Sequence, residues 1–230
     1  MTAAGADAGA GRDTGAEARP IDAVFWDFGG VFTASPFHAV RPYSASLGID
    51  HDELLDLVFG PYHLDTDHPW HRLERGEGTL AEAMGAAVRA AEARGVAFDP
   101  KAFFGAMRDD IDRSIVADTV RELRTHGVKH CIITNNAKEF ADGWRGIVPV
   151  DELFDDVVDS SAVGMRKPNP AIYELALGRL GVRDARRAVF LDDFAPNVDA
   201  ARALGFQGIV VEHPDPAMAE LRRLCGLSSR

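Results

Sequence analysis

The stretch "VFWDFGGVFTAS" (residues 24–35) decides the fold, because an apolar run ends in one carboxylate, Asp27, and two glycines follow it. The residues before Asp27 are mainly apolar, β-branched or aromatic, which is typical of a strand buried on both faces of a parallel sheet. Asp27 could simply end this strand at the solvent. Its place between an apolar run and a Gly-Gly pair favours a functional position at the carboxyl end of the strand.

Short runs of the same kind recur along the chain, with helical patterns between the later ones. The predicted strands are residues 21–28, 128–135, 154–160, 187–193 and 207–213. The predicted helices that alternate with them are residues 117–126, 170–180 and 196–204, and the last two begin with a proline suited to a first helical turn. This order predicts an α/β fold with a doubly wound, Rossmann-like parallel sheet.

Residues 36–115 interrupt the alternation and read as helices. Three pairs of residues form capping signals at expected helix starts: Asp50 with Glu53, Thr79 with Glu82, and Asp99 with Pro100. We therefore expect a helical cap over residues 36–115, which lies over the carboxyl edge of the sheet. The expected α/β core is then formed by residues 21–35 and 116–230.

The composition narrows the classes of partner. The chain has 230 residues, a hydrophobic content of 46% and a formal net charge of −11. That is enough for one core domain with a smaller insert. An acidic chain without a basic patch repels nucleic acid and anionic membrane, so we expect neither as a partner. No apolar run approaches the ~18 residues that a membrane span needs.

The two cysteines and the N-terminal segment indicate where the protein works. Cys131 and Cys225 are too few and too far apart for a disulfide framework or a cysteine metal site, so we expect a reducing, cytoplasmic setting. Residues 1–20 are rich in alanine and glycine, carry acids and have no apolar core. We expect a disordered tail there, and neither a secretory signal nor a transit peptide.

Polar side chains that suit phosphate chemistry fall at the ends of the predicted strands. They are Asp27, then Thr134 and Asn135 in "ITNN", Lys167 in "GMRKPNP", and Asp192 and Asp193 in "FLDD". Ligands of open α/β sheets bind at the carboxyl edge of the strands. Carboxylates there can hold Mg²⁺, a lysine can neutralise phosphate charge, and a carboxylate can act as a nucleophile.

Each of these segments also has a plain interpretation when it is taken alone. Asp192 with Asp193 could be a helix N-cap, and so could the run from Thr134 to Asn136. Lys167 beside Arg166 could be a solvated charge. The conjunction of all four segments at one edge of the sheet is what favours a site.

In this order and spacing, the segments "DFGGV", "TNN", "RKPNP" and "FLDD" resemble the four motifs of the haloacid dehalogenase (HAD) superfamily. The helical insert after the first motif is similar to the C1 cap of its IA-like subfamily. The longer segments "GMRKPNPAIYELALGRLGV" and "FLDDFAPNVDAARALG" resemble most the branch of the N-terminal phosphatase of soluble epoxide hydrolase and of the HAD domain fused to some acyl-CoA dehydrogenases. The resemblance covers residues 21 to about 213.

The resemblance implies a Mg²⁺-dependent phosphatase that forms an aspartyl-phosphate and acts on a small phosphorylated metabolite. It also implies a role for each matching residue: Asp27 as nucleophile and metal ligand, Gly29 as a metal ligand through its carbonyl, Thr134 and Asn135 as phosphate-binding residues, Lys167 as the catalytic lysine, Asp192 and Asp193 as metal-binding acids, and Asn197 as a supporting residue.

One expected residue is missing. Phosphatases of this superfamily usually have a second aspartate two residues after the nucleophile, as general acid and base, and this chain has Gly29 there. General acid–base catalysis is typically worth ~10²–10⁴ in rate. Three hypotheses remain open: a phosphatase that uses a good leaving group or a substitute donor, a weak catalyst that binds a ligand or regulates, and a 2-haloacid dehalogenase. The Asp192-Asp193 pair favours a metal site over the last.

The expected cap holds His63, His68, Trp70 and His71, whose spacing matches no zinc pattern. We interpret Trp70 as a packing residue and the histidines as facing solvent or the cleft, where one of these residues contacts the substrate. A further hypothesis is that His63, Trp70 or His71 replaces the missing acid. A monomer and a homodimer are both compatible with the sequence.

Overall fold

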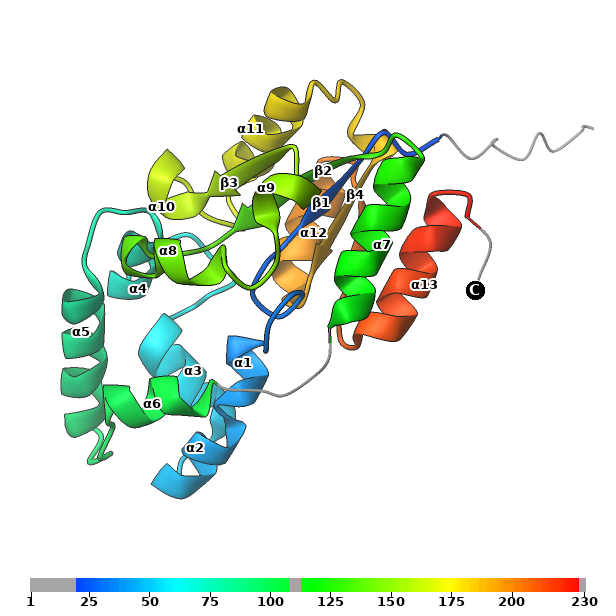
Figure 1. Ribbon diagram of the computed structural model, residues 1–230. Coiled ribbons are helices and arrows are strands. Elements are labelled where there is room, and N and C mark those ends of the chain that lie inside the picture. The colour runs from blue at the N-terminus through cyan, green and yellow to red at the C-terminus, as the bar shows by residue number, and fades with distance from the viewer. Residues whose placement is uncertain (1–19, 108–112, 228–230) are drawn as a thin grey trace, which may run out of the picture.

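The computed structural model describes residues 20–107 and 113–227 (Figure 1). The expected tail over residues 1–20 therefore lies outside the described residues, except for its last residue. The same holds for residues 108–112 of the expected cap.

Five parallel strands form one sheet in the order β3-β2-β1-β4-β5. Their bounds are β1 Ala23–Trp26, β2 Lys129–Thr134, β3 Asp156–Asp159, β4 Ala188–Asp192 and β5 Gln207–Val210. Each lies within a predicted strand. Trp26, in the central strand, stands beside Ile132 of β2 on one side and Leu191 of β4 on the other. The first, second and fourth strands along the chain are therefore neighbours in the sheet.

Helices cover both faces of the sheet, as the doubly wound prediction requires. Side chains of β1 alternate between the faces: Val24 and Trp26 pack with α7 (Ser114–Thr125) and α13 (Pro214–Leu224). Phe25 faces α11 (Pro170–Leu180) and α12 (Ala195–Ala203). In Figure 1, the green α7 and the red α13 lie side by side on one face. The remaining short helices of the core are η1 Lys138–Phe140, α8 Ala141–Trp144, α9 Val150–Leu153, α10 Ser160–Val163 and η2 Ala185–Arg187.

The described residues between β1 and α7 form a helical insert, residues 36–107, with a hydrophobic cluster of its own. Its helices are α1 Pro36–Ala39, α2 Arg41–Leu47, α3 His51–Phe59, α4 Pro69–Glu74, α5 Leu80–Glu92 and α6 Pro100–Ala106. The side chains of Asp50, Thr79 and Asp99 cap α3, α5 and α6, and Thr79 forms the full capping box with Glu82. The capping signals of the sequence therefore mark true helix starts.

One buried polar pair joins the neighbouring strands β1 and β2. The Trp26 indole Nε1 donates a 3.0 Å hydrogen bond to Nδ1 of His130, and neither residue is exposed. Burial lowers the pKa of His130 to about 3, so its imidazole is neutral at physiological pH. Cys131 and Cys225 are free thiols. Among the described residues, every helix is too short or too polar to cross a membrane.

Candidate active site

Three neighbouring strands bring their carboxyl ends to one edge of the sheet. Asp27 follows β1, Thr134 ends β2 and Asp192 ends β4. The loop between α10 and α11 adds Lys167. Because β1 is central, the side chains that follow it lie between those of both neighbours, and the four sequence segments meet at this edge as expected.

Lys167 lies at the centre of the site and is 1% exposed. Its Nζ is 2.8 Å from Oδ1 of Asp27 and 2.7 Å from Oδ2 of Asp192. Burial alone would lower the pKa of Lys167, but the carboxylates of Asp192 and Asp27 outweigh burial and raise it. The lysine is therefore a fixed positive charge that bridges two strands.

The acidic residues outnumber this positive charge. One carboxylate oxygen from each of Asp27, Asp192 and Asp193 lies within 4.8 Å of the other two. Burial, followed by the charge of Asp192, raises the pKa of Asp27 well above its usual value and that of Asp193 to about 7. Two buried carboxylates and the half-buried one of Asp193, against one ammonium, fit a divalent cation with oxygen ligands, such as Mg²⁺.

The two acids of "FLDD" differ in their surroundings. The carboxylate of Asp192 accepts hydrogen bonds from the Phe194 N–H at 2.8 Å, from Lys167 Nζ at 2.7 Å and from Asn197 Nδ2 at 3.1 and 3.2 Å. Oδ2 of Asp193 is buried and has no hydrogen-bond partner in the part of the chain that the structure describes. Asp193 thus has an oxygen left for a metal, whereas Asp192 is occupied by Lys167 and Asn197.

The two glycines after Asp27 play different structural parts. Gly30 has a φ of +78°, and a Cβ there would lie 2.1 Å from Cγ of Asp193. A Cβ on Gly29 would meet nothing closer than Cδ of Pro36, at 4.0 Å. Gly30 is therefore required by backbone conformation and by Asp193, while Gly29 leaves room for a side chain. Only the Gly-Gly pair itself hinted at the need for Gly30.

The side chain of Asn135 binds the main chain of Lys167, and the phosphate-binding role of Asn135 stays a prediction. Its side-chain Oδ1 accepts from the Lys167 N–H at 2.8 Å, and its Nδ2 donates to the Lys167 carbonyl at 3.0 Å and to the Tyr62 hydroxyl at 3.1 Å. The side chain thus holds the main chain of Lys167. Thr134, 5% exposed, lines the cavity in front of the site.

A cavity of about 420 Å³ opens beside Gly29. Besides Gly29, its lining comprises Phe28, Thr33, Thr134, Asn135, Asn136, Glu139, Phe140, Gly143, Trp144 and Ile147. Most of the large side chains in this lining are apolar, and Phe140 and Ile147 are 38% and 52% exposed. Glu139 is the one charged lining residue among those described. Sequence reasoning missed this wall because its residues carry no motif.

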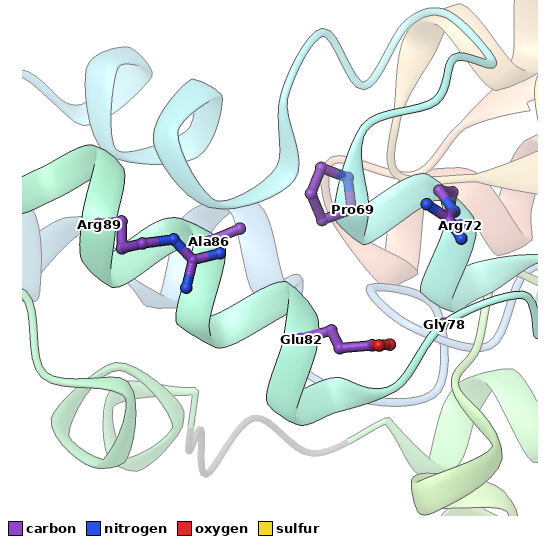
Figure 2. Close-up of a pocket in the computed structure, with 6 residues that line it drawn as sticks. All are labelled: Pro69, Arg72, Gly78, Glu82, Ala86 and Arg89. Atoms are coloured by element: carbon purple, nitrogen blue, oxygen red, sulfur yellow. The ribbon is translucent and has the colours of Figure 1, made fainter.

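A smaller cavity of about 200 Å³ lies on the insert between α4 and α5 (Figure 2). Its lining residues are Pro69, Arg72, Gly78, Glu82, Ala86 and Arg89, so none of the candidate site residues contributes to it, whereas Gly29, Thr134 and Asn135 line the larger cavity. Glu82 already accepts hydrogen bonds from Thr79 in the capping box. The cavity at the strand edge is therefore the better candidate for a substrate site.

The histidines of the insert have mostly internal partners. His71 is fully buried, and its Nδ1 accepts from the Thr66 N–H at 3.1 Å. Burial lowers the pKa of His71 to about 3, which keeps the ring neutral. His68 caps α4 by accepting from the Trp70 N–H. His63 lines a third cavity, of about 290 Å³, together with Phe194.

Comparison with known proteins places this geometry in a family. The family profile of haloacid dehalogenase-like hydrolases matches residues 21–205. The chain is 28% identical to mouse acyl-CoA dehydrogenase family member 10 over 94% of its length, and 34% identical to mouse bifunctional epoxide hydrolase 2 over 45%. It spans about a fifth of each of these two relatives.

One relative of similar length and two solved structures complete the comparison. A sesquiterpene phosphatase of Aspergillus oryzae is 27% identical over 89% of this chain and 96% of its own. A magnesium complex of a HAD family enzyme from Bacteroides thetaiotaomicron covers 84% of this chain and 93% of its own with a TM-score of 0.56 and 20% identity. A dehalogenase structure covers 91% of this chain and 98% of its own, with a TM-score of 0.60 and 19% identity. At these identities the structures support the fold alone.

Proposed function

The chain belongs to the haloacid dehalogenase-like hydrolases, and we propose from this premise that it is a Mg²⁺-dependent phosphatase with Asp27 as its nucleophile. The observation that carries the proposal is the group of Asp27, Asp193 and Lys167 at the strand edge, beside a cavity. The helical insert acts as the cap in this proposal, small phosphate monoesters are the substrates, and the cytoplasm is the location.

The proposed metal ligands are Asp27, the carbonyl of Gly29 and Asp193. Asp193 is favoured over Asp192 because its buried Oδ2 has no partner within the described residues. Mg²⁺ bound there would neutralise charge on the phosphate and on Asp27. Asp192 then serves to hold Lys167 in place.

The residues of the chain divide the chemistry between them. Oδ1 of Asp27 already accepts from Phe28 N–H at 2.7 Å and from Lys167, so Oδ2 is the proposed attacking atom. A bond forms between this oxygen and phosphorus, and the bond from phosphorus to the alcohol oxygen breaks with its electron pair on that oxygen. Lys167 and the Thr134 hydroxyl hold the phosphoryl oxygens. The alkoxide takes a proton from solvent water, because Gly29 supplies no acid, and leaves as the alcohol. A second water then attacks phosphorus, the bond from phosphorus to Oδ2 breaks, and inorganic phosphate leaves with the Asp27 carboxylate regenerated.

The cavity indicates the class of leaving group. Phe28, Phe140, Trp144 and Ile147 form an apolar wall, and Glu139 would repel a second phosphate or carboxylate. A cavity of about 420 Å³ lies within the usual range for small ligands, roughly 300–1,000 Å³. We therefore propose monophosphate esters of an apolar alcohol as substrates. The resemblance to a sesquiterpene phosphatase supports this class.

The test is hydrolysis of p-nitrophenyl phosphate, acetyl phosphate, farnesyl phosphate and glucose 6-phosphate, each with Mg²⁺ and with a chelator. We expect metal-dependent turnover that Asp27→Asn abolishes, and a higher kcat/KM for farnesyl phosphate than for glucose 6-phosphate. The reverse preference would refute the apolar class and leave the phosphatase standing. Absence of all turnover would refute the phosphatase itself.

A second candidate function is a weak catalyst that binds a phosphorylated ligand, and Gly29 is the observation that favours it. This alternative requires phosphate binding without turnover of any of the four esters. The dehalogenase alternative requires metal-independent release of halide from 2-haloacids, which the same preparation can test.

A further inference from the structure

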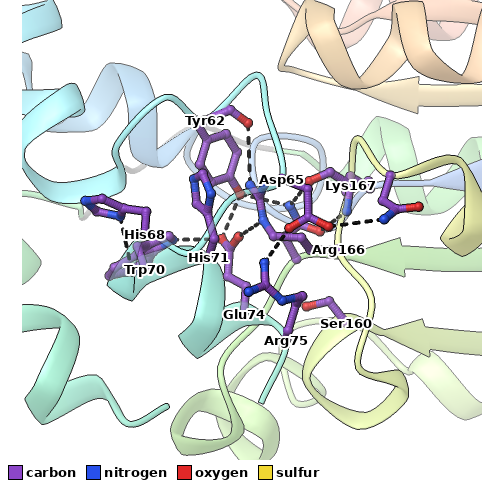
Figure 3. Close-up of polar contacts among 12 residues, drawn as sticks. Tyr62, Asp65, His68, Trp70, His71, Glu74, Arg75, Ser160, Arg166 and Lys167 are labelled. Atoms are coloured by element: carbon purple, nitrogen blue, oxygen red, sulfur yellow. Dashed lines mark hydrogen bonds and ion pairs between the residues drawn. The ribbon is translucent and has the colours of Figure 1, made fainter. Parts of the chain in front are cut away.

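We infer that Arg166 is a positioning residue, whose buried ion pair with Glu74 fastens the helical insert to the loop that carries Lys167 and so holds Lys167 between Asp27 and Asp192. Figure 3 shows the ion pair of Arg166 with Glu74, and Lys167 beside it. Nζ of Lys167 lies 2.8 Å from Asp27 and 2.7 Å from Asp192. The inference rests on the proposed function in one respect, which is the catalytic part given to Lys167.

The ion pair is entirely enclosed. Arg166 is 0% and Glu74 is 4% exposed, and Nε of Arg166 lies 2.7 Å from Oε2 of Glu74. The other carboxylate oxygen of Glu74 accepts from the Tyr62 hydroxyl and from Trp70 Nε1, both at 2.8 Å. Nη1 of Arg166 donates to the Leu64 carbonyl, and its guanidinium lies 4.6 Å from the centre of the Tyr62 ring. All these partners of Arg166 belong to the insert.

A second set of contacts leads from the same group to the catalytic lysine. Lys167 directly follows Arg166, and both hydrogen-bonding groups of its main chain are held by the side chain of Asn135. That amide also donates to the Tyr62 hydroxyl, which in turn donates to Glu74. The ion pair is thus connected to Lys167 in two ways: by the peptide bond from Arg166, and by the hydrogen bonds through Tyr62 and Asn135.

A third contact ties the far end of the loop. Asp65 of the insert accepts a 3.2 Å hydrogen bond from Nδ2 of Asn169 and forms an ion pair with Arg75. Asn169 also caps α11 through its Oδ1. The loop of residues 166–169 is therefore held by the insert at both ends.

Stability alone is a poor explanation for such a pair. Removal of two charges from water costs several kcal/mol, and replacement of a buried ion pair by apolar residues is often neutral for folding. The directional bonds of a guanidinium, in contrast, define the position of the main chain next to it. Lys167 needs this accuracy because displacement of a catalytic group by ~1 Å can cost ~10²-fold in rate.

The experiment compares three variants with the native chain. Arg166→Met removes one partner, and Arg166→Met with Glu74→Gln removes both charges while the amide oxygen can still accept from Tyr62 and Trp70. Arg222→Met is the matched control, because Arg222 is 9% exposed and pairs at 2.8 Å with Glu122, so that the pair joins α13 and α7 of the core and not the insert. The readouts are Tm, kcat and KM for p-nitrophenyl phosphate with Mg²⁺, and acetylation of Lys167 by acetic anhydride relative to exposed Lys101, measured by mass spectrometry.

We expect the double variant to keep a native-like Tm but to lose about 10–100-fold in kcat with little change in KM, the size of effect seen when groups that orient catalytic residues are removed. Acetylation of Lys167 should rise about tenfold, because a loosened loop exposes the amine. Arg222→Met should lower Tm and leave kcat and Lys167 acetylation unchanged.

The inference is overturned if the double variant behaves like the control, with native kcat and a protected Lys167. A lower Tm of the double variant, with kcat and Lys167 acetylation unchanged, would likewise show that Arg166 is a purely structural residue. If the native chain has no turnover, the proposed function fails. The acetylation of Lys167 then decides the positioning inference by itself.

Discussion

Gly29→Asp should convert the site into a better catalyst for esters with poor leaving groups. The new Cβ meets only Cδ of Pro36, at 4.0 Å, and Gly29 lies in the lining of the cavity, so an aspartate fits and can reach a bound ester. Gly29 also has no left-handed φ, unlike Gly30. The substitution therefore adds an acid without strain in the backbone.

The magnitude follows from the chemistry of the leaving group. A positioned general acid contributes about 10²–10⁴-fold, which corresponds to about 2.7–5.5 kcal/mol in the activation free energy. An alkyl phosphate, whose alkoxide is strongly basic, needs this proton. Acetyl phosphate and p-nitrophenyl phosphate have weakly basic leaving groups and gain little from it. We expect the ratio of kcat/KM for alkyl over p-nitrophenyl phosphate to rise at least about 100-fold.

The assay is a pair of progress curves with Mg²⁺, one for each ester, on the native chain and three variants. Gly29→Asn has the size of the new side chain without its acid and should leave the ratio unchanged. Gly30→Ala should lose activity on both esters, because its Cβ would lie 2.1 Å from Cγ of Asp193. The reasoning is refuted if Gly29→Asp folds and turns over p-nitrophenyl phosphate but gains nothing on the alkyl ester, or if Gly29→Asn gains equally.

Three further predictions test the metal, the cavity and the buried histidine. Mg²⁺ at a hundredfold excess over its Kd should stabilise the native chain by about 2.7 kcal/mol and so raise its Tm. Asp193→Asn should abolish this rise, and an unchanged rise in the variant would place the metal elsewhere. Ile147→Ser, at a position 52% exposed, should leave Tm unchanged and raise KM for farnesyl phosphate up to about tenfold but not KM for acetyl phosphate, and equal effects on both would contradict the apolar wall. The pKa of His130 is about 3 in the folded chain and near 6.5 in the unfolded chain, so the unfolded state binds more protons between pH 3 and pH 6.5. The free energy of unfolding should therefore fall as pH falls from 6.5 towards 3, by up to about 1.4 kcal/mol per pH unit. His130→Gln, which can still accept from Trp26, should flatten that slope in denaturant titrations, and an unaltered slope would assign the acid sensitivity to other groups.

Several site residues could be placed from sequence because their positions depend on local patterns. An apolar run that ends in Asp27, and another that ends in Asp192, predict buried parallel strands, and parallel strands bring their carboxyl ends to one edge. The capping box of Thr79 and Glu82 is equally local, and the structure contains it. These features need no knowledge of distant contacts.

Other features depend on residues far apart in the chain, and no local pattern announces them. Nothing in the sequence indicated that Arg166 is fully buried, which is possible because Glu74, on another element, neutralises it. His71 read as a candidate acid, yet burial lowers the pKa of its ring to about 3. No local pattern predicted that the side chain of Asn135 holds the main chain of Lys167.

The sequence by itself determined the layers of the fold, the edge of the sheet where the polar residues gather and the absence of an acid at position 29. Tertiary structure alone decided which oxygens are still unoccupied, as the contrast between Asp192 and Asp193 shows. It also decided that Gly30 must lack a side chain and that an ion pair holds the loop of Lys167 to the insert. The physical reason is that secondary structure follows from neighbours in the chain, whereas burial, pKa and hydrogen-bond occupancy follow from neighbours in space.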